Sequence, residues 1–153
     1  MSHKPEAAIC ALGTTQALAG SKEAFRHVDY ELPIAFGKAA HSAGVETYAI
    51  VTAMGSSVDS AAFYYRTKGE VERDIQQIGF RSLTICRPSL ISGKRNEAQG
   101  GIGALALRLA EFLGPVLPKK FRVSPADTIA SSLLNAVIVA KSGCNWINAE
   151  EMN

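Results

Sequence analysis

The sequence predicts an α/β fold in which a doubly wound parallel β-sheet carries helices on both faces. Short apolar runs alternate with stretches in which apolar side chains recur at helical spacing. Glycine or proline separates most of these segments, as expected at the ends of strands and helices. Strands that alternate with helices form βαβ units with right-handed crossovers, and such units build a parallel sheet. The 153 residues suit one domain, spanning residues 1–153.

The first strand is predicted in the apolar run 7–12, which ends at Gly13. A continuous apolar run fits a strand buried on both faces, although periodicity alone does not distinguish it from a buried helix. The residues from 14 to 20 are expected to form a polar loop. Ser21 is a suitable N-cap for a short helical turn that reaches Phe25.

The next segment is a helix between Asp29 and Ala43, where apolar side chains recur at helical spacing. Gly44 is typical of the residue that ends a helix. Pro33 lacks an amide N–H and is tolerated only in a first turn. The regular helix is therefore expected to begin near Asp29 or to kink early.

The central part of the chain predicts a strand, a helix and a further strand. The run 47–53 is rich in β-branched and aromatic residues, and a Gly-Ser-Ser turn follows it. A helix is expected over 60–78 because its apolar residues lie on one face. A third strand is expected over 81–86, where Pro88 stops it.

The last third predicts a loop, two helices and a final strand. The stretch 92–101 is polar and rich in glycine, which is typical of a loop that carries function. A helix is expected over 102–112. Ser124 is expected to be the N-cap of a helix over 125–141, because proline occupies its first position. The final strand is predicted over 144–148.

The charge distribution and the residue types exclude several classes of partner. The 16 Lys and Arg residues and 14 Asp and Glu residues are spread without blocks, which argues against binding of nucleic acid or of an anionic membrane. No apolar run approaches the roughly 20 residues that a membrane span needs. The three histidines lack the spacing of metal ligands, so we expect no metal site.

The cysteines and the first residues predict the compartment. Three cysteines lie far apart and none belongs to a CxxC motif, so neither a disulfide framework nor a zinc site is expected. The N-terminus includes an acidic residue and no long apolar stretch follows it, which argues against a signal peptide. These features predict a cytoplasmic protein.

The candidate chemistry lies on the helix predicted over 60–78. Tyr64 and Lys68 are four residues apart, so both project from one helix face. A cation beside a phenol stabilises the phenolate and lowers the tyrosine pKa, which would suit acid–base catalysis on a small-molecule substrate. Thr52, at the end of the preceding strand, would donate a hydrogen bond to the same substrate oxygen. Alternatively, Tyr64 is an aromatic residue at the edge of the core and Lys68 is a surface residue.

An ordered series of motifs resembles the atypical short-chain dehydrogenase/reductase superfamily. Within it, the chain is similar to the NAD(P)H-binding group related to Tat-interacting oxidoreductases and nucleotide-sugar epimerases. The resemblance covers nearly the whole chain, and the matching stretches are 10–15, 28–30, 51–55, 63–72, 87–89 and 123–127.

The resemblance implies catalytic roles for three residues. Tyr64 matches the catalytic tyrosine, and Lys68 matches the lysine that binds the nicotinamide ribose and tunes the tyrosine. Thr52 lies where many members have a catalytic serine, and its hydroxyl keeps the hydrogen-bond donor. The implied function is that of an NAD(P)-dependent oxidoreductase or epimerase-like protein.

The resemblance also implies contacts with an NAD or NADP cofactor. Gly13, Thr14 and Thr15 match the turn that follows the family's fourth strand and lies along the cofactor's ribose. Pro88 and Ser89 match the loop after the sixth strand, whose backbone lies near the nicotinamide. Gly13 and Pro88 also have a simpler explanation, because glycine and proline are ordinary strand terminators.

The glycine-rich GxxGxxG turn that opens this family is absent. The only glycine-dense stretch, 100–103, follows a polar loop instead of a strand, so it does not fit that motif. The resemblance therefore implies a single truncated, partial Rossmann-like sheet with strands equivalent to the fourth onward. Cofactor binding is then open, and the alternatives are a non-catalytic interaction or regulatory module and a degenerate fragment that has lost cofactor binding.

The truncated sheet has consequences for association and for the surface. The strand at 7–12 would become an apolar sheet edge, and such edges invite pairing. We expect a homodimer through the helices 29–43 and 60–78, as in related dehydrogenases, with edge pairing besides. Glu70, Glu72 and Asp74 are expected on the solvated face of their helix. The resemblance places residues 94–96 on the substrate side.

Overall fold

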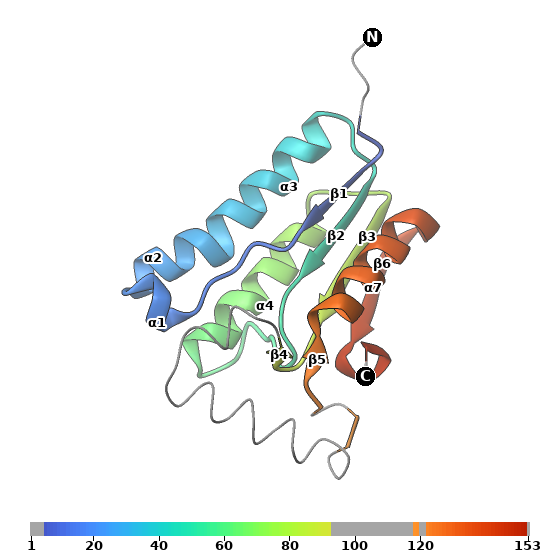
Figure 1. Cartoon of the computed structure of the whole chain (residues 1–153). Helices are drawn as coiled ribbons and strands as arrows, with labels where there is room; N and C mark the ends of the chain where they lie inside the picture. The colour runs from blue at the N-terminus through green and yellow to red at the C-terminus, as the bar shows by residue number, and fades with distance from the viewer. Residues whose placement is uncertain (1–4, 93–117, 120–121, 153) are drawn as a thin grey trace.

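A computed structural model describes residues 5–92, 118–119 and 122–152 (Figure 1). Its main sheet has four parallel strands in the order β1-β2-β3-β6. These strands are β1 (Ala7–Cys10), β2 (Thr47–Val51), β3 (Ser82–Arg87) and β6 (Gly143–Asn148). The predicted α/β class and the parallel sheet are confirmed. The helix predicted over 102–112, the glycine-dense stretch 100–103 and all but the first residue of the loop predicted over 92–101 lie outside the described residues. That first residue, Ser92, belongs to a strand instead.

Helices cover both faces of this sheet, as Figure 1 shows. Helix α3 (Leu32–Ser42) and helix α4 (Phe63–Gln76) lie on one face, and α7 (Ala126–Val139) lies on the other. The remaining described elements are α1 (Gln16–Ala19), α2 (Lys22–Arg26), a π-helical turn (His27–Glu31), the paired strands β4 (Ile91–Ser92) and β5 (Ser124–Pro125), and a 3-10 helix (Ala149–Met152). No helix among them is long and apolar enough to cross a membrane.

The strand side chains alternate between two hydrophobic cores. On the first face, Ile50 and Ile85 pack with Val71 and Ile75 of α4, and all four are almost fully buried. On the second face, Ala49 and Cys86 pack with α7 and with the 3-10 helix. β2 and β3 are buried on both faces, so both are rich in apolar and β-branched residues, which is typical of parallel sheets.

A π-helical turn just before α3 explains how the helix accommodates Pro33, which has no amide N–H to donate. The π-helical turn His27–Glu31 separates α2 from α3, and the Leu32 N–H bonds to the His27 carbonyl across five residues. Pro33 then lies in the first turn of α3, where a missing N–H is tolerated. The regular helix therefore begins at Leu32 and not near Asp29, and the wide turn brings the Asp29 side chain into the interior, where it is 0% exposed.

Several predicted boundaries are confirmed and others are wrong. Ser21 caps α2, because its hydroxyl accepts a hydrogen bond from the Ala24 N–H at 3.0 Å. The predicted loop over 14–20 contains the short helix α1, which Thr15 caps. Ser124 is not the N-cap of α7. It belongs to β5, and its hydroxyl accepts from the Ser89 N–H at 3.2 Å, so a tertiary contact replaces the expected local cap.

Candidate functional site

A cleft of about 470 Å³ opens at the carboxyl ends of β1 and β2. In doubly wound sheets this edge is where ligands bind, and the volume falls in the usual range of small-molecule sites. Seven of the eight predicted site residues line the cleft, namely Gly13, Thr14, Thr15, Thr52, Tyr64, Lys68 and Ser89. Pro88 does not line it, because it is fully buried and its carbonyl accepts a hydrogen bond from the Met54 N–H at 2.8 Å.

Helix α4 presents Tyr64 and Lys68 to the same cleft. The helix also carries Val71 and Ile75 on the face toward the sheet, so burial of these two residues orients the polar pair. The Tyr64 ring packs against Phe25, with ring centroids 5.6 Å apart. Among the described residues no protein group hydrogen-bonds the Tyr64 hydroxyl, so this hydroxyl is available to a ligand in the cleft.

Asp29 pairs with Lys68 and is the site residue that sequence reasoning missed. The Lys68 ammonium lies 2.5 Å from Asp29 Oδ1, with side-chain exposures of only 6% and 0%. The other carboxylate oxygen, Oδ2, accepts from the Thr14 N–H at 2.8 Å. The sequence did single out Asp29, because this residue lies in the stretch 28–30 that carries the family resemblance. Its neighbours in the chain, however, gave no reason to assign it a partner in α4.

Gly13 passes close to this ion pair. A Cβ atom at Gly13 would lie 3.3 Å from Asp29 Oδ1 and 3.6 Å from Lys68 Nζ. The first distance is shorter than most carbon–oxygen contacts, so a side chain here would push the carboxylate. The absence of a side chain therefore lets the chain after β1 approach the buried charges, and Gly13 has a packing role besides ending the strand.

The predicted lowering of the Tyr64 pKa is wrong in sign. Burial, the nearby Asp29 carboxylate and Tyr65 together raise the pKa of Tyr64 to about 12, and burial is the largest of these causes. The sequence argument considered the Lys68 cation alone. In the structure Asp29 compensates that cation, so Tyr64 is a neutral phenol at physiological pH and acts as a hydrogen-bond donor.

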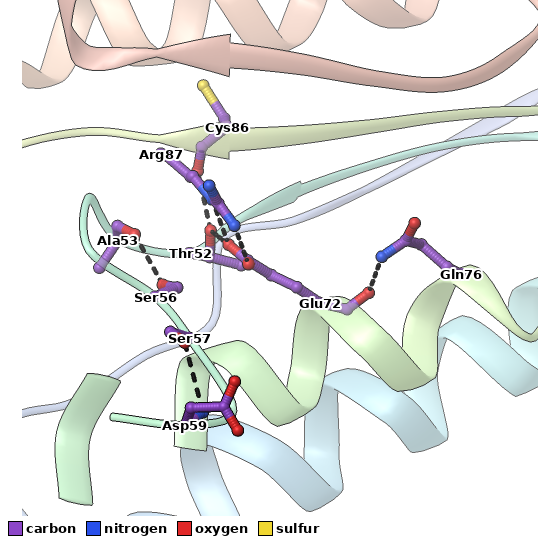
Figure 2. A network of polar contacts seen from close by, with 9 residues as sticks. All are labelled: Thr52, Ala53, Ser56, Ser57, Asp59, Glu72, Gln76, Cys86 and Arg87. Atoms are coloured by element: carbon purple, nitrogen blue, oxygen red, sulfur yellow. Dashed lines mark hydrogen bonds and ion pairs between the residues drawn. The ribbon is translucent and has the colours of Figure 1, made fainter. Parts of the chain in front are cut away.

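A buried polar network lies behind the cleft and joins β2, α4 and β3 (Figure 2). The Thr52 hydroxyl donates to Glu72 Oε1 at 2.6 Å. The Arg87 guanidinium binds both carboxylate oxygens of Glu72, with Nε 2.9 Å from Oε1 and Nη2 2.5 Å from Oε2. This bidentate contact raises the pKa of Arg87. The guanidinium also stacks on the Trp146 ring, 4.3 Å from its centroid.

The predicted exposure of Glu72 is therefore wrong. Glu72 is only 3% exposed. It lies one helical turn after Lys68, so it shares the face of α4 that points to the strand ends. Glu70 and Asp74 are partly exposed and pair with Arg26 and Arg73, respectively. The sequence pattern did not distinguish the buried carboxylate of Glu72 from the partly exposed carboxylates of Glu70 and Asp74.

Two hydroxyl groups that were predicted to contact substrate or cofactor make hydrogen bonds within the protein instead. The proton of the Thr52 hydroxyl is directed at Glu72, so Thr52 offers a lone pair rather than a proton to the cleft. The Ser89 hydroxyl donates to the Arg122 carbonyl and lies 3.1 Å from the Ser124 hydroxyl. Residues 94–96 lie outside the described residues. No group of three or more potential metal ligands occurs in the described part of the chain.

Gly69 holds the loop after β2 against α4. A Cβ atom on Gly69 would lie 2.3 Å from the Ser57 carbonyl carbon, so only glycine permits this approach. The same loop is closed by the Ser56 hydroxyl, which donates to the Ala53 carbonyl at 2.6 Å (Figure 2). This packing holds the residues that follow Thr52 close to the helix that carries Tyr64.

Solved structures of nucleotide-binding enzymes share this fold. RMD from Pseudomonas aeruginosa, complexed with NADPH, superimposes with a TM-score of 0.65 at 14% identity, covering 96% of this chain and 61% of that chain. UDP-glucose 4-epimerase from Thermotoga maritima, with UDP-glucose, gives a TM-score of 0.65 at 10% identity, covering 95% of this chain and 56% of that chain. At these identities the similarity shows a Rossmann-like fold.

Curated relatives are fungal proteins named for mitochondria. Protein fmp52, mitochondrial, of Emericella nidulans is 37% identical over 141 residues, which cover 91% of this chain and 60% of that protein. Protein FMP52, mitochondrial, of Debaryomyces hansenii is 41% identical over 90 residues, covering 59% and 40%. These names contradict the cytoplasmic location expected from the cysteines and the N-terminus, because scattered thiols do not distinguish one reducing compartment from another.

The chain matches part of each relative's length and is matched over most of its own. The chain spans about 60% of the length of the first curated relatives that it matches. A sequence profile of the HIM1 family matches residues 4–111, which is more than half of the chain. This chain therefore belongs to the HIM1 family.

Proposed function

We propose that this chain carries the nicotinamide side of an NAD(P)-dependent oxidoreductase or epimerase site of the short-chain dehydrogenase type. The observation that carries the proposal is the joint placement of Tyr64 and Lys68 in one cleft at the carboxyl ends of β1 and β2. The roles that we assign to Tyr64 and Lys68 follow from their contacts. Tyr64 is the proton donor and acceptor, and Lys68 is the cation that binds the cofactor ribose.

The donors and acceptors of the cleft fit the sugar and ring of a nicotinamide nucleotide. Lys68 is a cationic donor, while the Thr14 and Thr15 hydroxyls can accept or donate to the hydroxyls of a ribose. Apolar residues Leu12 and Val51 supply surface for a planar ring. Gly13 leaves room beside the ion pair, where a Cβ atom would be crowded.

The chemistry assigned to this chain is proton transfer at the Tyr64 oxygen. When bound, the cofactor supplies or accepts the hydride. Tyr64 is protonated at neutral pH, because its pKa is raised to about 12, so it is suited to protonate a carbonyl oxygen as negative charge develops there. Lys68 stabilises the resulting phenolate, and Asp29 holds the ammonium in place.

The comparisons support the cofactor class without identifying a substrate. Solved neighbours in complexes with NADPH, NADP and NAD share the fold. The names of the fungal relatives support a mitochondrial location, which we propose for this protein as well. Mitochondria supply both nicotinamide cofactors, so this location is compatible with the proposed function.

One observation favours the alternative, a non-catalytic binding or regulatory module. The Thr52 hydroxyl donates to Glu72, although the dehydrogenase proposal gave it the role of donor to the substrate. A protein that binds a nicotinamide nucleotide but does not use it would tolerate this arrangement. The two functions differ in turnover and not in cofactor binding.

Cofactor titration tests the proposal directly. Binding of NADH and NADPH to the 153-residue chain can be followed by the fluorescence of the reduced nicotinamide. We expect saturable binding that weakens at least tenfold in Lys68→Met, which loses the ribose contact. Tyr64→Phe should bind as wild type does, because the ring remains. Lys141→Met, at an exposed position, is the matched control and should have no effect.

The outcome separates the candidate functions. Binding that is lost in Lys68→Met, together with carbonyl reduction that is lost in Tyr64→Phe, supports the oxidoreductase. Binding without turnover in any of a panel of aldehydes and ketones supports the non-catalytic module. No detectable binding at millimolar NADH or NADPH would contradict the oxidoreductase and would favour an interaction module or a degenerate fragment that has lost cofactor binding.

A further inference from the structure

The backbone that follows β2 stays bonded to β3 beyond the end of the strand. The Thr52 N–H donates to the Cys86 carbonyl at 2.8 Å, and the Met54 N–H donates to the Pro88 carbonyl at 2.8 Å. These two hydrogen bonds continue the parallel pairing of β2 with β3. The backbone between them is therefore still extended.

The backbone N–H of Ala53 points away from β3. In an extended chain successive peptide groups are turned to opposite sides, so successive N–H groups point in opposite directions within the sheet. Because the N–H groups of Thr52 and Met54 point to β3, that of Ala53 points to the β1 side. The pairing of β1 with β2 ends at Cys10 and Ile50. Beyond this pair the chain leaves β1 toward α1, whereas β2 runs on (Figure 1).

The Ala53 N–H has no hydrogen-bond partner within the described ranges of the chain. The carbonyl of the same residue does have partners, because it accepts from the Ser56 N–H at 3.2 Å and from the Ser56 hydroxyl at 2.6 Å. Ala53 is 8% exposed and lines the cleft that also contains Tyr64 and Lys68. Buried N–H groups without a partner are rare, because the hydrogen bond lost from water is not replaced. At the wall of a cleft, such a group marks a place for an acceptor atom of a ligand.

A backbone donor also fills the role that the Thr52 side chain does not take. The Thr52 hydroxyl donates to Glu72 Oε1 at 2.6 Å, so its proton is not offered to the cleft. The next residue along the chain brings an N–H to the same cleft. Hydrogen bonds to β3 on both sides of Ala53 hold this N–H in a fixed direction, so binding an acceptor requires no side chain to be ordered.

We propose that the Ala53 N–H donates a hydrogen bond to a carbonyl oxygen of the ligand in this cleft. The proposal rests on the proposed function, which offers two such oxygens, that of a substrate aldehyde or ketone and that of the nicotinamide carboxamide. On a substrate, the carbonyl electron pair moves to the oxygen as the carbon receives hydride. The Ala53 N–H stabilises the developing negative charge, and Tyr64 delivers the proton that the oxygen takes.

Heteronuclear NMR of the 153-residue chain tests the donor without turnover. In the absence of ligand, the Ala53 amide proton should exchange with solvent faster than that of Met54, which is bonded to Pro88. The carbonyl probes are acetophenone and nicotinamide. Their matched controls are ethylbenzene and β-picoline, which keep the ring and lack the carbonyl oxygen. We expect a carbonyl probe to move the Ala53 amide proton downfield and its control not to do so.

The two probes distinguish the two sources of the oxygen. A downfield shift with acetophenone alone assigns the Ala53 N–H to the substrate carbonyl. A downfield shift with nicotinamide alone assigns it to the carboxamide of the cofactor. Either result supports the proposal.

Two variants remove the N–H itself. Ala53→Pro replaces it with a ring carbon, and Thr52 is already extended, as the residue before a proline prefers. Lactic acid in place of Ala53, introduced by nonsense suppression, changes only N–H to oxygen and serves if the proline variant does not fold. Each should bind the active probe up to about tenfold more weakly. Lactic acid in place of the exposed Ala61, outside the cleft, is the matched control and should have no effect.

Turnover gives a second measurement for the substrate assignment. For an aldehyde or ketone that wild type reduces, lactic acid in place of Ala53 should lower kcat about 100-fold with little change in KM, because the charge develops only in the transition state.

Three results would overturn the proposal. They are an Ala53 amide as protected as that of Met54 before any ligand is added, an amide that moves with neither carbonyl probe, and one that moves equally with the controls. Failure of the proposed function is a separate result, because the probes contain no nucleotide. A chain that does not bind NADH or NADPH but whose Ala53 amide responds to acetophenone would keep the donor and lose the dehydrogenase.

Discussion

Replacing Lys68 by methionine should destabilise the protein by leaving the Asp29 carboxylate buried without a countercharge. Asp29 is 0% exposed and its only cationic neighbour within the described residues is Lys68, 2.5 Å away. Methionine has a similar length, so little cavity forms and the loss is electrostatic. Removing one partner of a buried ion pair typically costs about 3–5 kcal/mol. We expect a value near the lower end, roughly 3 kcal/mol, because the Thr14 N–H still binds the carboxylate.

The double variant Lys68→Met/Asp29→Asn separates this cost from simple loss of packing. With both charges removed, no uncompensated carboxylate remains, and the asparagine oxygen can still accept from the Thr14 N–H. We expect the double variant to recover most of the loss, which corresponds to a coupling of roughly 2–3 kcal/mol between the two positions. The free energy of unfolding is measured by urea denaturation at neutral pH, with circular dichroism as the probe.

A control variant and the size of the stability loss show whether the ion pair between Lys68 and Asp29 is responsible. Lys141→Met, at an exposed position, is the control and should change the free energy of unfolding by no more than about 0.5 kcal/mol. If Lys68→Met costs less than about 1 kcal/mol, the ion pair is not the buried contact described above. If the two single effects simply add in the double variant, the residues are not coupled.

Three further predictions concern groups around the cleft. The difference in free energy of unfolding between wild type and Tyr64→Phe should be constant below about pH 10 and should then fall by roughly 2 kcal/mol between pH 10 and 12. The folded state holds the phenol proton to a pKa of about 12, whereas the unfolded chain releases it near 10. Gly69→Ala should cost roughly 2–3 kcal/mol in urea denaturation, because its Cβ would lie 2.3 Å from the Ser57 backbone. Arg87→Met should cost roughly 3 kcal/mol by the same assay, because it leaves the carboxylate of Glu72 buried without a cation.

Each of these predictions has a matched control. For the first prediction Tyr64→Phe is itself the reference, and a fall in that variant equal to the fall in wild type would refute the assignment. Gly37→Ala should lower the free energy of unfolding less than Gly69→Ala does, because its Cβ meets the flexible end of Ile75 rather than backbone. Arg81→Met breaks only an exposed pair and should cost less than about 1 kcal/mol.

The strands and the reactive pair could be predicted because they depend on local pattern. The runs that became β2 and β3 are rich in apolar and β-branched residues, since both faces of a parallel strand are buried. The spacing of Tyr64 and Lys68 puts them on one helix face whatever surrounds the helix. The alternation of elements then placed the ends of β1 and β2 on one edge, and the cleft lies there.

The partners of those residues could not be predicted in the same way. Asp29 lies far from Lys68 in the chain, and its position depends on a π-helical turn that no local pattern indicated. Glu72 has the same residue type and the same kind of neighbours as the exposed carboxylates beside it. Its burial depends on Arg87 and Thr52, which come from two different strands.

The sequence by itself determined the main strands and helices, the parallel arrangement of the strands and the presence of a tyrosine and a lysine at the strand ends. These properties follow from short-range periodicity and from the handedness of crossovers. Only the tertiary structure decided the electrostatic state of the site: Asp29 neutralises Lys68, the pKa of Tyr64 rises instead of falling, and Glu72 accepts the hydrogen bond that the Thr52 hydroxyl donates. Charge interactions depend on distance and burial in space, and those are set by the packing of residues that are remote in sequence.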